Sequence, residues 1–418
     1  MKLQEIKKLT ADSINVAVPA SKSILSRALI LAAFTEGDTL LHAGRYGEDT
    51  RDMLSCLRAL GFAVEELPEG LLVHGVREIP NSCAALNVGS AGTAARFLTA
   101  VLALRGGDYT LYASPQMERR PMDMLTALEA YGVRIEYLGA HGHFPFRMQS
   151  TGISAQKISI DTQSSTQYAS GLMLAAAVGS LPLTISFPGG RSSYIAMTGA
   201  LIEAFGGKVT QNENEITVNP ISVAPKEYAT ESDVSAACYF YALSLLLRTK
   251  VCVKNIHRKS LQGDTRFLSL LEDAGVLLES NPEGILADGS SIENFCGFDL
   301  NMQEFSDQAL TVAALAPFAS SPTRIRGIAH IRKQECDRIN AIVENLTALG
   351  VPSSATEDEI YIEPAPVRGG TVKSFGDHRV AMAFALIGLK TGNLFIENPS
   401  CVRKTFDNYF EILDELTR

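Results

Sequence analysis

The chain has 418 residues with 46 acidic and 37 basic side chains, and its formal net charge of −9 argues against broad binding to nucleic acid. No apolar stretch reaches the roughly 18 residues of a membrane span, and the start, Met1 to Lys8, lacks the apolar centre of a signal peptide. The seven cysteines include no Cys-x-x-Cys pair, so neither a disulfide framework nor a zinc site is indicated. We expect reduced thiols and a cytoplasmic protein.

One local pattern recurs every 70 to 72 residues, a short polar cluster followed by a long apolar helical run. The clusters are anchored at Ser23, Thr93, Ser165, Ser235, Asp307 and His378. The apolar runs are Ile24 to Phe34, Ala94 to Leu104, Leu172 to Val178, Ala236 to Leu247, Ala309 to Phe318 and Val380 to Leu389. Because these runs are apolar on nearly every side, they predict six buried helices.

A second series of helices alternates with the first. Five amphipathic segments end at a glycine that leads into a strand-like segment, and these glycines are Gly61, Gly132, Gly206, Gly275 and Gly350. Glycine commonly ends a helix in the left-handed conformation. The chain is therefore interpreted as six copies of one unit of about 70 residues, longer than the usual solenoid repeats. The sixth copy is truncated, because its amphipathic helix, Tyr409 to Leu416, ends the chain.

Three copies per domain is the natural division of a chain of this length. We predict one domain over residues 19–232 and a second over residues 233–418, completed by residues 1–18. The polar cluster around Ser235 then marks the crossover between the domains. A hydrophobic content of 46% is enough for two cores.

The first cluster places Lys22 and Ser23 at the start of a helix, with Arg27 one turn further on the same face. Hydroxyls, cations and backbone N–H groups at a helix start favour an anion. The alternative is a serine cap with two solvated cations.

The next two clusters also combine polar groups with a helix start. Gly92 belongs to a glycine-rich loop, with Arg96 one turn into the helix, but the loop lacks the Gly-Lys-Ser/Thr ending of a Walker A motif. Ser165, Thr166 and Gln167 suit recognition of hydroxyl or phosphate groups. Simple capping remains the alternative for both clusters.

In the second half of the chain, the cluster at Ser235 has ordinary capping chemistry and receives no catalytic role. Asp307 is an acid at a helix start, where a cap is the alternative. Asp377 is the natural cap of the last buried helix, which leaves His378 and Arg379 for other contacts.

Cations stand at or near these helix starts, although charge runs are usually solvated faces. They are Lys22, Arg27, Arg96, Arg120, Arg338, Arg379 and Lys404. If the copies bring equivalent helix starts together, these cations predict a ligand with several negative charges, divided between the domains.

Eight motifs, in order along the whole chain, resemble those of the 5-enolpyruvylshikimate-3-phosphate synthase family. They are Ser21-Lys22-Ser23 with Arg27, Ala91-Gly92-Thr93 with Arg96, Arg120-Pro121, Ser165-Thr166-Gln167, Asp307, Glu335 with Asp337 and Arg338, Asp377-His378-Arg379, and Lys404-Thr405-Phe406. The resemblance implies a two-domain inside-out α/β barrel, with three βαβαββ copies per domain and the active site in the cleft between them.

The resemblance also implies which residues hold two substrates. Shikimate-3-phosphate would contact Lys22, Ser23, Arg27, Ser165, Thr166, Gln167, Arg191, Tyr194, Asp307 and Gln334. Phosphoenolpyruvate would contact Lys22, Gly92, Arg120, Gln167, Arg338, Arg379 and Lys404. Its phosphate and carboxylate carry about three charges, which these cations would match.

The implied reaction transfers the enolpyruvyl group of phosphoenolpyruvate to the 5-hydroxyl of shikimate-3-phosphate, through a tetrahedral intermediate, on the way to aromatic amino acids. Asp307 would take the hydroxyl proton, and Glu335 or Lys22 would deliver a proton to the methylene carbon. No cofactor or metal is implied, because fixed cations stabilise the departing phosphate. The two substrates would be the partners, without nucleic acid or membrane, and a monomer would suffice.

Three positions depart from the usual pattern of this family. Ser90 stands in place of an asparagine, Arg191 in place of a serine and Gln334 in place of a lysine. Arg191 either strengthens the phosphate contact or displaces it to Ser192. Lys333 either replaces the charge missing at Gln334 or does not.

Two other functions compete with this interpretation. The sister transferase acting on UDP-N-acetylglucosamine normally carries a catalytic cysteine, but the corresponding segment, Ser114 to Arg120, has none. The second alternative is a phosphometabolite-binding protein without catalysis. Asp307, Glu335 and Lys22 argue against it, because binding alone would not require an acid and a base.

Overall fold

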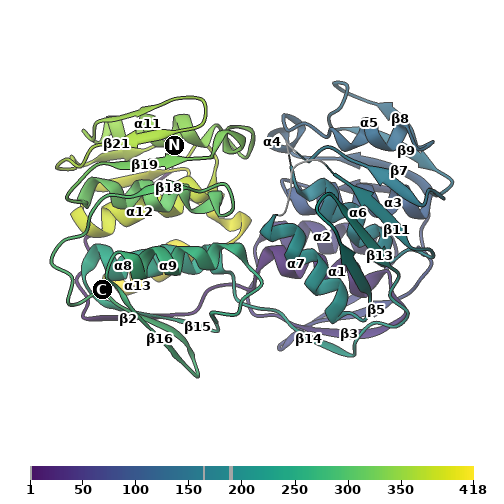
Figure 1. Cartoon of the computed structure of the whole chain (residues 1–418), viewed down its shortest axis with the longest axis horizontal. Coiled ribbons are helices and arrows are strands. Elements are labelled where there is room, and N and C mark those ends of the chain that lie inside the picture. Colours follow the sequence, from purple (N-terminus) through teal and green to yellow (C-terminus); the bar gives the residue numbers. More distant parts are fainter. Residues whose placement is uncertain (1, 163–164, 188–191) are drawn as a thin grey trace. The chain divides into compact units, whose positions relative to one another are not determined.

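The computed structural model describes residues 2–162, 165–187 and 192–418, and the chain divides into two units. The central unit contains residues 20–231, and the terminal unit contains residues 1–19 and 232–418 (Figure 1). Each unit contains three small sheets.

The three sheets of the central unit have the strand orders β14-β3-β5-β4, β6-β7-β9-β8 and β10-β11-β13-β12. In each sheet the first pair of strands is parallel and the other two pairs are antiparallel, which is the pairing of a βαβαββ copy. The strands are β3 (Gly37–His42), β4 (Ala63–Leu67), β5 (Gly70–Gly75), β6 (Cys83–Asn87), β7 (Gly107–Tyr112), β8 (Arg134–Tyr137), β9 (Phe146–Ser150), β10 (Lys157–Ser159), β11 (Leu183–Ser186), β12 (Lys208–Gln211), β13 (Glu215–Asn219) and β14 (Glu227–Ala229).

The terminal unit repeats this pairing in two four-stranded sheets, β16-β17-β15-β2 and β18-β19-β21-β20, and in the three-stranded sheet β1-β23-β22. The strands are β1 (Leu3–Ile6), β2 (Ser13–Val16), β15 (Lys250–Lys254), β16 (Leu277–Asn281), β17 (Gly284–Asp288), β18 (Asp299–Asn301), β19 (Thr323–Arg326), β20 (Ser353–Ala355), β21 (Ile360–Ile362), β22 (Gly370–Val372) and β23 (Leu394–Glu397).

Three strands each join the sheet of a copy that is distant from them in the sequence. β14, near residue 228, pairs in parallel with β3 of the first copy, and β2, near residue 15, pairs in parallel with β15 of the fourth copy. β1 pairs antiparallel with β23, so the beginning of the chain supplies a strand to the truncated sixth copy. The chain therefore crosses between the units twice, immediately before α1 and immediately before α8.

Six helices are buried along most of their length, as the apolar runs predict. They are α1 (Lys22–Ala33), α3 (Gly92–Arg105), α6 (Gln167–Ala177), α8 (Val234–Leu247), α10 (Ala309–Leu315) and α12 (His378–Thr391). The apolar run after Asp307 continues beyond α10 as the 3-10 helix η3 (Ala316–Phe318), where Pro317 has no N–H to donate. No helix in the described ranges is long and apolar enough to cross a membrane.

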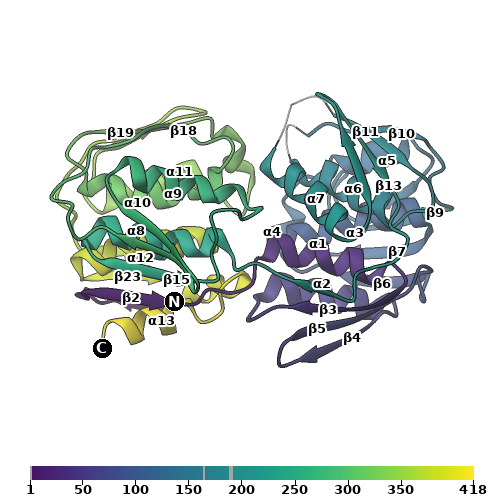
Figure 2. The same cartoon turned by 60° about the horizontal axis from the view of Figure 1, so that its bottom comes forward.

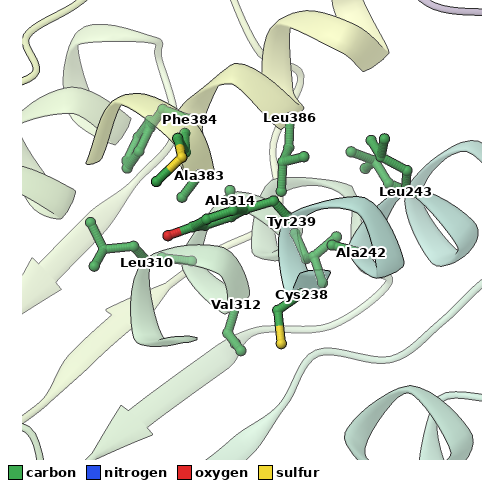
Figure 3. Close-up of a cluster of buried hydrophobic side chains, with 14 of the residues drawn as sticks. Cys238, Tyr239, Ala242, Leu243, Leu310, Val312, Ala314, Ala383, Phe384 and Leu386 are labelled. Atoms are coloured by element: carbon green, nitrogen blue, oxygen red, sulfur yellow. The ribbon is translucent and has the colours of Figure 1, made fainter. Parts of the chain in front are cut away.

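These helices form the interior of each unit. α1, α3 and α6 contact one another in the central unit, and α8, α10 and α12 do so in the terminal unit. Figures 1 and 2 show α8 and α12 between the sheet of β18 and β19 and the sheet of β2 and β15. The ring of Tyr239 on α8 lies beside Leu310 and Ala314 of α10 and Ala383 of α12 (Figure 3). The expected α/β fold of six βαβαββ copies is confirmed. In each unit the buried helices lie inside and the sheets lie outside.

The second series of helices is also confirmed. It comprises α2 (Glu48–Ala59), α5 (Met124–Glu129), α7 (Ser193–Ala204), α9 (Arg266–Asp273), α11 (Arg338–Ala348) and α13 (Tyr409–Leu416), besides the short α4 (Pro115–Glu118). The glycine that follows each of the first five has a positive φ between 82° and 97°. Other residues rarely adopt this conformation, which explains why glycine recurs at these ends.

Candidate active site

The polar clusters at the helix starts differ in what their side chains do. Ser21 caps α1, Asp233 caps α8 and Asp377 caps α12, each by accepting a backbone N–H of the first turn. Asp307 is not an N-cap residue: it lies in the 3-10 helix η2 (Ser306–Gln308), and Gln308 is the N-cap residue of α10. The carboxylate of Asp307 pairs instead with two arginines.

Among the described residues of the central unit, Arg27 of α1 is the most deeply buried cation, with 1% of its surface exposed. Its guanidinium donates to Thr198 Oγ1 at 2.8 Å and to the Ser23 carbonyl at 2.7 Å, and it lies 4.9 Å above the ring of Phe97. Among the described residues no carboxylate pairs with it. Burial lowers the pKa of Arg27 to about 10, so the side chain stays charged near neutral pH. A buried cation with neutral partners is suited to an anionic ligand.

A second group of polar side chains converges on Gly92 at the start of α3. A Cβ atom added to Gly92 would lie 3.1 Å from Arg96 Nη1, 3.3 Å from Arg120 Nη1 and 3.4 Å from Gln167 Oε1. Gln167 Oε1 is buried and has no hydrogen-bond partner within the described ranges. Two guanidinium groups and an amide therefore face a position without a side chain, an arrangement that admits a small anion close to the backbone.

Lys22, the first residue of α1, is held by a carboxylate from the neighbouring helix. Its Nζ lies 3.1 Å from Oδ2 of Asp49 on α2, and Asp49 has 1% of its side chain exposed while Lys22 has 19%. The buried carboxylate fixes the direction of a partly exposed ammonium group.

The other residues of the central unit that we expect to bind substrate make only some contacts with the residues described above. Ser165 Oγ accepts the backbone N–H of Gln167, whereas Thr166, the N-cap residue of α6, makes no capping bond with its side chain. Tyr194 contributes its backbone carbonyl to Arg27 and to Thr198. Arg191 lies outside the described residues.

Arg338, the first residue of α11, joins three carboxylates in the terminal unit. Its guanidinium lies 2.9 Å from Asp307 Oδ1, 3.0 Å from Glu335 Oε2 and 2.7 Å from Asp377 Oδ2, and only 1% of its side chain is exposed. Burial alone would lower the pKa of Arg338, but these carboxylates outweigh it and hold the pKa above its ordinary value. Burial would raise the pKa of Asp377, and Arg338 together with His378 holds it well below its usual range.

Arg379 reaches the same carboxylate from α12. Its Nη2 lies 2.8 Å from Asp307 Oδ2, and its Nη1 donates to the hydroxyl of Tyr239 at 3.5 Å. Asp307 is thus held from two directions while 16% of its side chain stays exposed. The arrangement provides a fixed carboxylate beside two guanidinium groups.

The remaining expected residues of the terminal unit surround this cluster or lie at the end of the chain. Gln334 Oε1 accepts a hydrogen bond from Arg338 Nη1, whereas Lys333 is exposed. Lys404 is 5% exposed at the end of the 3-10 helix η5 (Pro399–Lys404). Burial lowers the pKa of His378. This effect outweighs the contact with Asp377, which would raise the pKa.

Several residues around these clusters were not identified from the sequence. Asp49 holds Lys22, Met117 accepts from Arg96 through its sulfur at 3.5 Å, and Asp264 accepts from Gln308 at 2.9 Å. None of them stands at one of the six anchors. Within the described residues no group of His, Cys, Asp and Glu side chains is arranged to hold a metal ion.

Six copies of one unit, with buried arginines and carboxylates at or near helix starts, indicate an α/β protein with sites suited to anionic small molecules. The chain belongs to the EPSP synthase (3-phosphoshikimate 1-carboxyvinyltransferase) family, whose model matches residues 4–413.

Relatives agree with this assignment, and solved structures share the fold. A 3-phosphoshikimate 1-carboxyvinyltransferase of Nostoc punctiforme is 37% identical over 94% of both chains, and one of Halalkalibacterium halodurans is 34% identical over 96% of this chain and 91% of its own. EPSP synthase from Acinetobacter baumannii has the same fold, with a TM-score of 0.80 at 23% identity over 99% of this chain and 98% of that one. The enolpyruvyl transferase NikO from Streptomyces tendae shares the fold with a TM-score of 0.75 at 16% identity over 99% and 97%.

Proposed function

We propose that this protein is a 3-phosphoshikimate 1-carboxyvinyltransferase. It transfers the enolpyruvyl group of phosphoenolpyruvate to the 5-hydroxyl of shikimate-3-phosphate and releases phosphate. The observation that carries the proposal is the family match over residues 4–413, together with relatives of this activity that are 34–37% identical over nearly the whole chain.

The reaction has two steps, an addition and an elimination. The 5-hydroxyl oxygen bonds to the central carbon of phosphoenolpyruvate, the hydroxyl loses its proton, and the methylene carbon gains one. The resulting tetrahedral intermediate then loses phosphate and a methyl proton, which restores the double bond. The protein must therefore accept and return protons beside several negative charges.

We assign the proton transfer at the hydroxyl to Asp307. Its carboxylate is partly exposed and is oriented by Arg338 and Arg379, as a general base requires. Glu335, which is 10% exposed, or Lys22 delivers the proton to the methylene carbon. Both are held by a partner of opposite charge, Glu335 by Arg338 and Lys22 by Asp49.

The anionic groups of the substrates are assigned to the cations. Phosphoenolpyruvate would be held by Lys22, Gly92, Arg120, Gln167, Arg338, Arg379 and Lys404. The polar groups around Gly92 support this assignment, because a phosphate or carboxylate accepts several N–H groups at once. Shikimate-3-phosphate would be held by Lys22, Ser23, Arg27, Ser165, Thr166, Gln167, Tyr194, Asp307 and Gln334. Arg191 is assigned to the same substrate from its position in the resemblance alone, where the family usually has a serine.

The direct test is release of inorganic phosphate from phosphoenolpyruvate in the presence of shikimate-3-phosphate, with the enolpyruvyl ether identified by mass spectrometry. We expect both products in equal amounts. Binding of both substrates without phosphate release would overturn the proposal in favour of a binding protein. Release with UDP-N-acetylglucosamine in place of shikimate-3-phosphate would overturn it in favour of the sister transferase.

We further propose that the protein acts as a monomer in the cytoplasm. All seven cysteines lie within the described ranges, and none of them forms a disulfide there. Reduced thiols are usual in a reducing compartment. Sedimentation at several protein concentrations would detect an oligomer.

Gly92→Ala should weaken binding of the inhibitor glyphosate more than it weakens binding of phosphoenolpyruvate. Glyphosate is a compact analogue of phosphoenolpyruvate. The added methyl group would lie within 3.1 Å of Arg96 Nη1 and would narrow the site. A change of one methyl group shifts selectivity by about 10-fold or more. Inhibition constants and KM measured on the same variant would test this. Gly44→Ala is the control, since no atom lies within 4 Å of its Cβ position. Equal losses for both ligands would show that Gly92 does not line the site.

Gln334→Ala should lower turnover by about 10- to 100-fold, because a hydrogen bond from the charged guanidinium of Arg338 contributes about 1.5–3 kcal/mol. A glutamine cannot act as acid or base near neutral pH, and here its amide oxygen accepts from Arg338. Lys333→Ala should leave turnover near that of the wild type, since Lys333 is exposed. Steady-state kinetics of both variants would decide whether Lys333 replaces the missing charge. A large loss with Lys333→Ala would show that it does.

A further inference from the structure

Asp264 has a buried carboxylate that contacts the residue next to Asp307. The proposed reaction assigns no role to Asp264. It lies in the 3-10 helix η1 (Gly263–Thr265), just before α9, and is 5% exposed. Its Oδ2 atom accepts two hydrogen bonds, one from Gln308 Nε2 at 2.9 Å and one from the hydroxyl of Ser235 at the start of α8. One oxygen atom thereby joins three elements of the terminal unit.

Gln308 connects this oxygen to the candidate base. It follows Asp307 directly in the chain and is completely buried. Its amide has one defined orientation, because Oε1 accepts from Thr311 Oγ1 at 2.9 Å while Nε2 donates to Asp264. Fixing the side chain of Gln308 fixes the backbone of η2, from which the carboxylate of Asp307 projects.

The segment that carries Asp264 is anchored independently of Gln308. The amide of Gln262 accepts from the Val234 N–H at 3.0 Å and donates to the Ser232 carbonyl at 2.8 Å. Both contacts lie at the start of α8, and Gln262 is 5% exposed. The segment of Asp264 is therefore anchored to α8. Asp264 and Asp307 both lie in 3-10 helices, which have poorer hydrogen-bond geometry than an α-helix, so η2 depends on the side-chain contacts that hold it.

We propose that Asp264 is a positioning residue for the reaction: by binding Gln308 and Ser235 it holds η2 so that the Asp307 carboxylate stays between Arg338 and Arg379. The inference rests on the proposed function, because it assigns a support to the base of that reaction. Displacing a reacting group by about 1 Å costs on the order of 100-fold in rate.

The charge of Asp264 is a separate property from its hydrogen bonds. The pKa of Asp264 is raised to about 6, because burial and the Asp307 carboxylate together outweigh Arg379 and the hydrogen bonds from Ser235 and Gln308. The buried thiol of Cys238 on α8 also faces this residue, with its sulfur 3.7 Å from the Asp264 carbonyl. A test must therefore separate the loss of the hydrogen bonds from the loss of the charge.

Two alanine variants and their combination test whether Asp264 acts through Gln308. We expect Asp264→Ala and Gln308→Ala each to lower kcat by about 10- to 100-fold, with a smaller change in KM for either substrate. The double variant should be no slower than the slower single variant, because both changes break the same connection. Losses that multiply in the double variant would overturn the proposal.

Asp264→Asn separates geometry from charge. The amide oxygen can still accept from Gln308 and Ser235, so we expect this variant to recover most of the kcat lost in Asp264→Ala. An asparagine variant as slow as the alanine variant would overturn a positioning role. Thermal unfolding of each variant, with the exposed Asp273→Asn on α9 as the control, measures folding separately. A lower Tm with an unchanged kcat would also overturn the proposal.

Wild-type protein in the same assay separates this inference from the proposed function. If it releases no phosphate from phosphoenolpyruvate and shikimate-3-phosphate, the proposed function fails and the inference fails with it. If it is active and Asp264→Ala is equally active, only the inference fails.

Discussion

Replacing Asp307 with asparagine should lower turnover by about 10²- to 10⁴-fold, the usual contribution of a positioned general acid or base. Asparagine keeps the size of the side chain but only one of the two oxygens, so it can accept from Arg338 or from Arg379 as Asp307 does, and it cannot take a proton near neutral pH. The loss should therefore fall on kcat, while KM for the two substrates changes little. Steady-state phosphate release at saturating substrate would measure it.

Asp299→Asn provides the control for this experiment. Asp299 pairs with an arginine of the same unit, Arg326 at 2.6 Å, but 62% of its side chain is exposed. Exposed ion pairs contribute little, so this variant should keep the wild-type rate. If Asp307→Asn retained turnover within about 10-fold of the wild type, the proton would have to leave the hydroxyl by another route, and the role assigned to Asp307 would be wrong.

The repeat made most of the fold predictable. Six apolar runs and five glycines at nearly constant spacing predict two helices per copy, and the positive φ of Gly61 and its four counterparts confirms why glycine recurs. Residues 1–18 were assigned to the second domain, but the repeat did not predict that β2 pairs with β15 or that β14 pairs with β3. A short alternating strand shows which of its faces is buried but not which sheet it joins, because that choice depends on pairing partners more than 180 residues away.

The sequence indicated candidate site residues mainly at helix starts. Lys22, Gly92, Asp307 and Arg379 occupy such positions, and motif order drew attention to them. Asp49 and Asp264 were missed because a buried carboxylate in an ordinary helix or loop resembles a surface one in sequence. Nor did the sequence show that Arg338 pairs with three carboxylates, since the pairing arises only when η2, α11 and α12 pack together.

Replacing Arg338 with methionine should destabilise the folded protein by about 3–5 kcal/mol at neutral pH, the usual cost of removing one partner from a buried ion pair. Methionine fills a similar space but leaves Asp307, Glu335 and Asp377 close together without the guanidinium between them. Like charges and burial then oppose the ionised state of all three. Urea unfolding would measure the loss as a lower midpoint.

Arg324→Met in the same unit is the matched control. Arg324 pairs with Glu359 at 2.7 Å, but 45% of its side chain is exposed, against 1% for Arg338. An exposed pair contributes about 1 kcal/mol or less, so this variant should unfold close to the wild type. Similar losses in both variants would show that the contacts of Arg338 add no more stability than a surface ion pair.

The effect of Arg338→Met should depend on pH. In the wild type the pKa of Asp377 is held below its unfolded value of about 3.9, so its stabilising contribution is complete above that value and is lost as the pH falls through the folded pKa. Without Arg338, burial and the neighbouring carboxylates raise the folded pKa of Asp377 above the unfolded value.

The destabilisation of the variant is then largest at neutral pH and is relieved as the carboxylates take up protons. The stability difference between wild type and variant should therefore narrow from neutral pH toward about pH 4. A constant difference over this range would show that the three carboxylates do not depend on Arg338 for their charge.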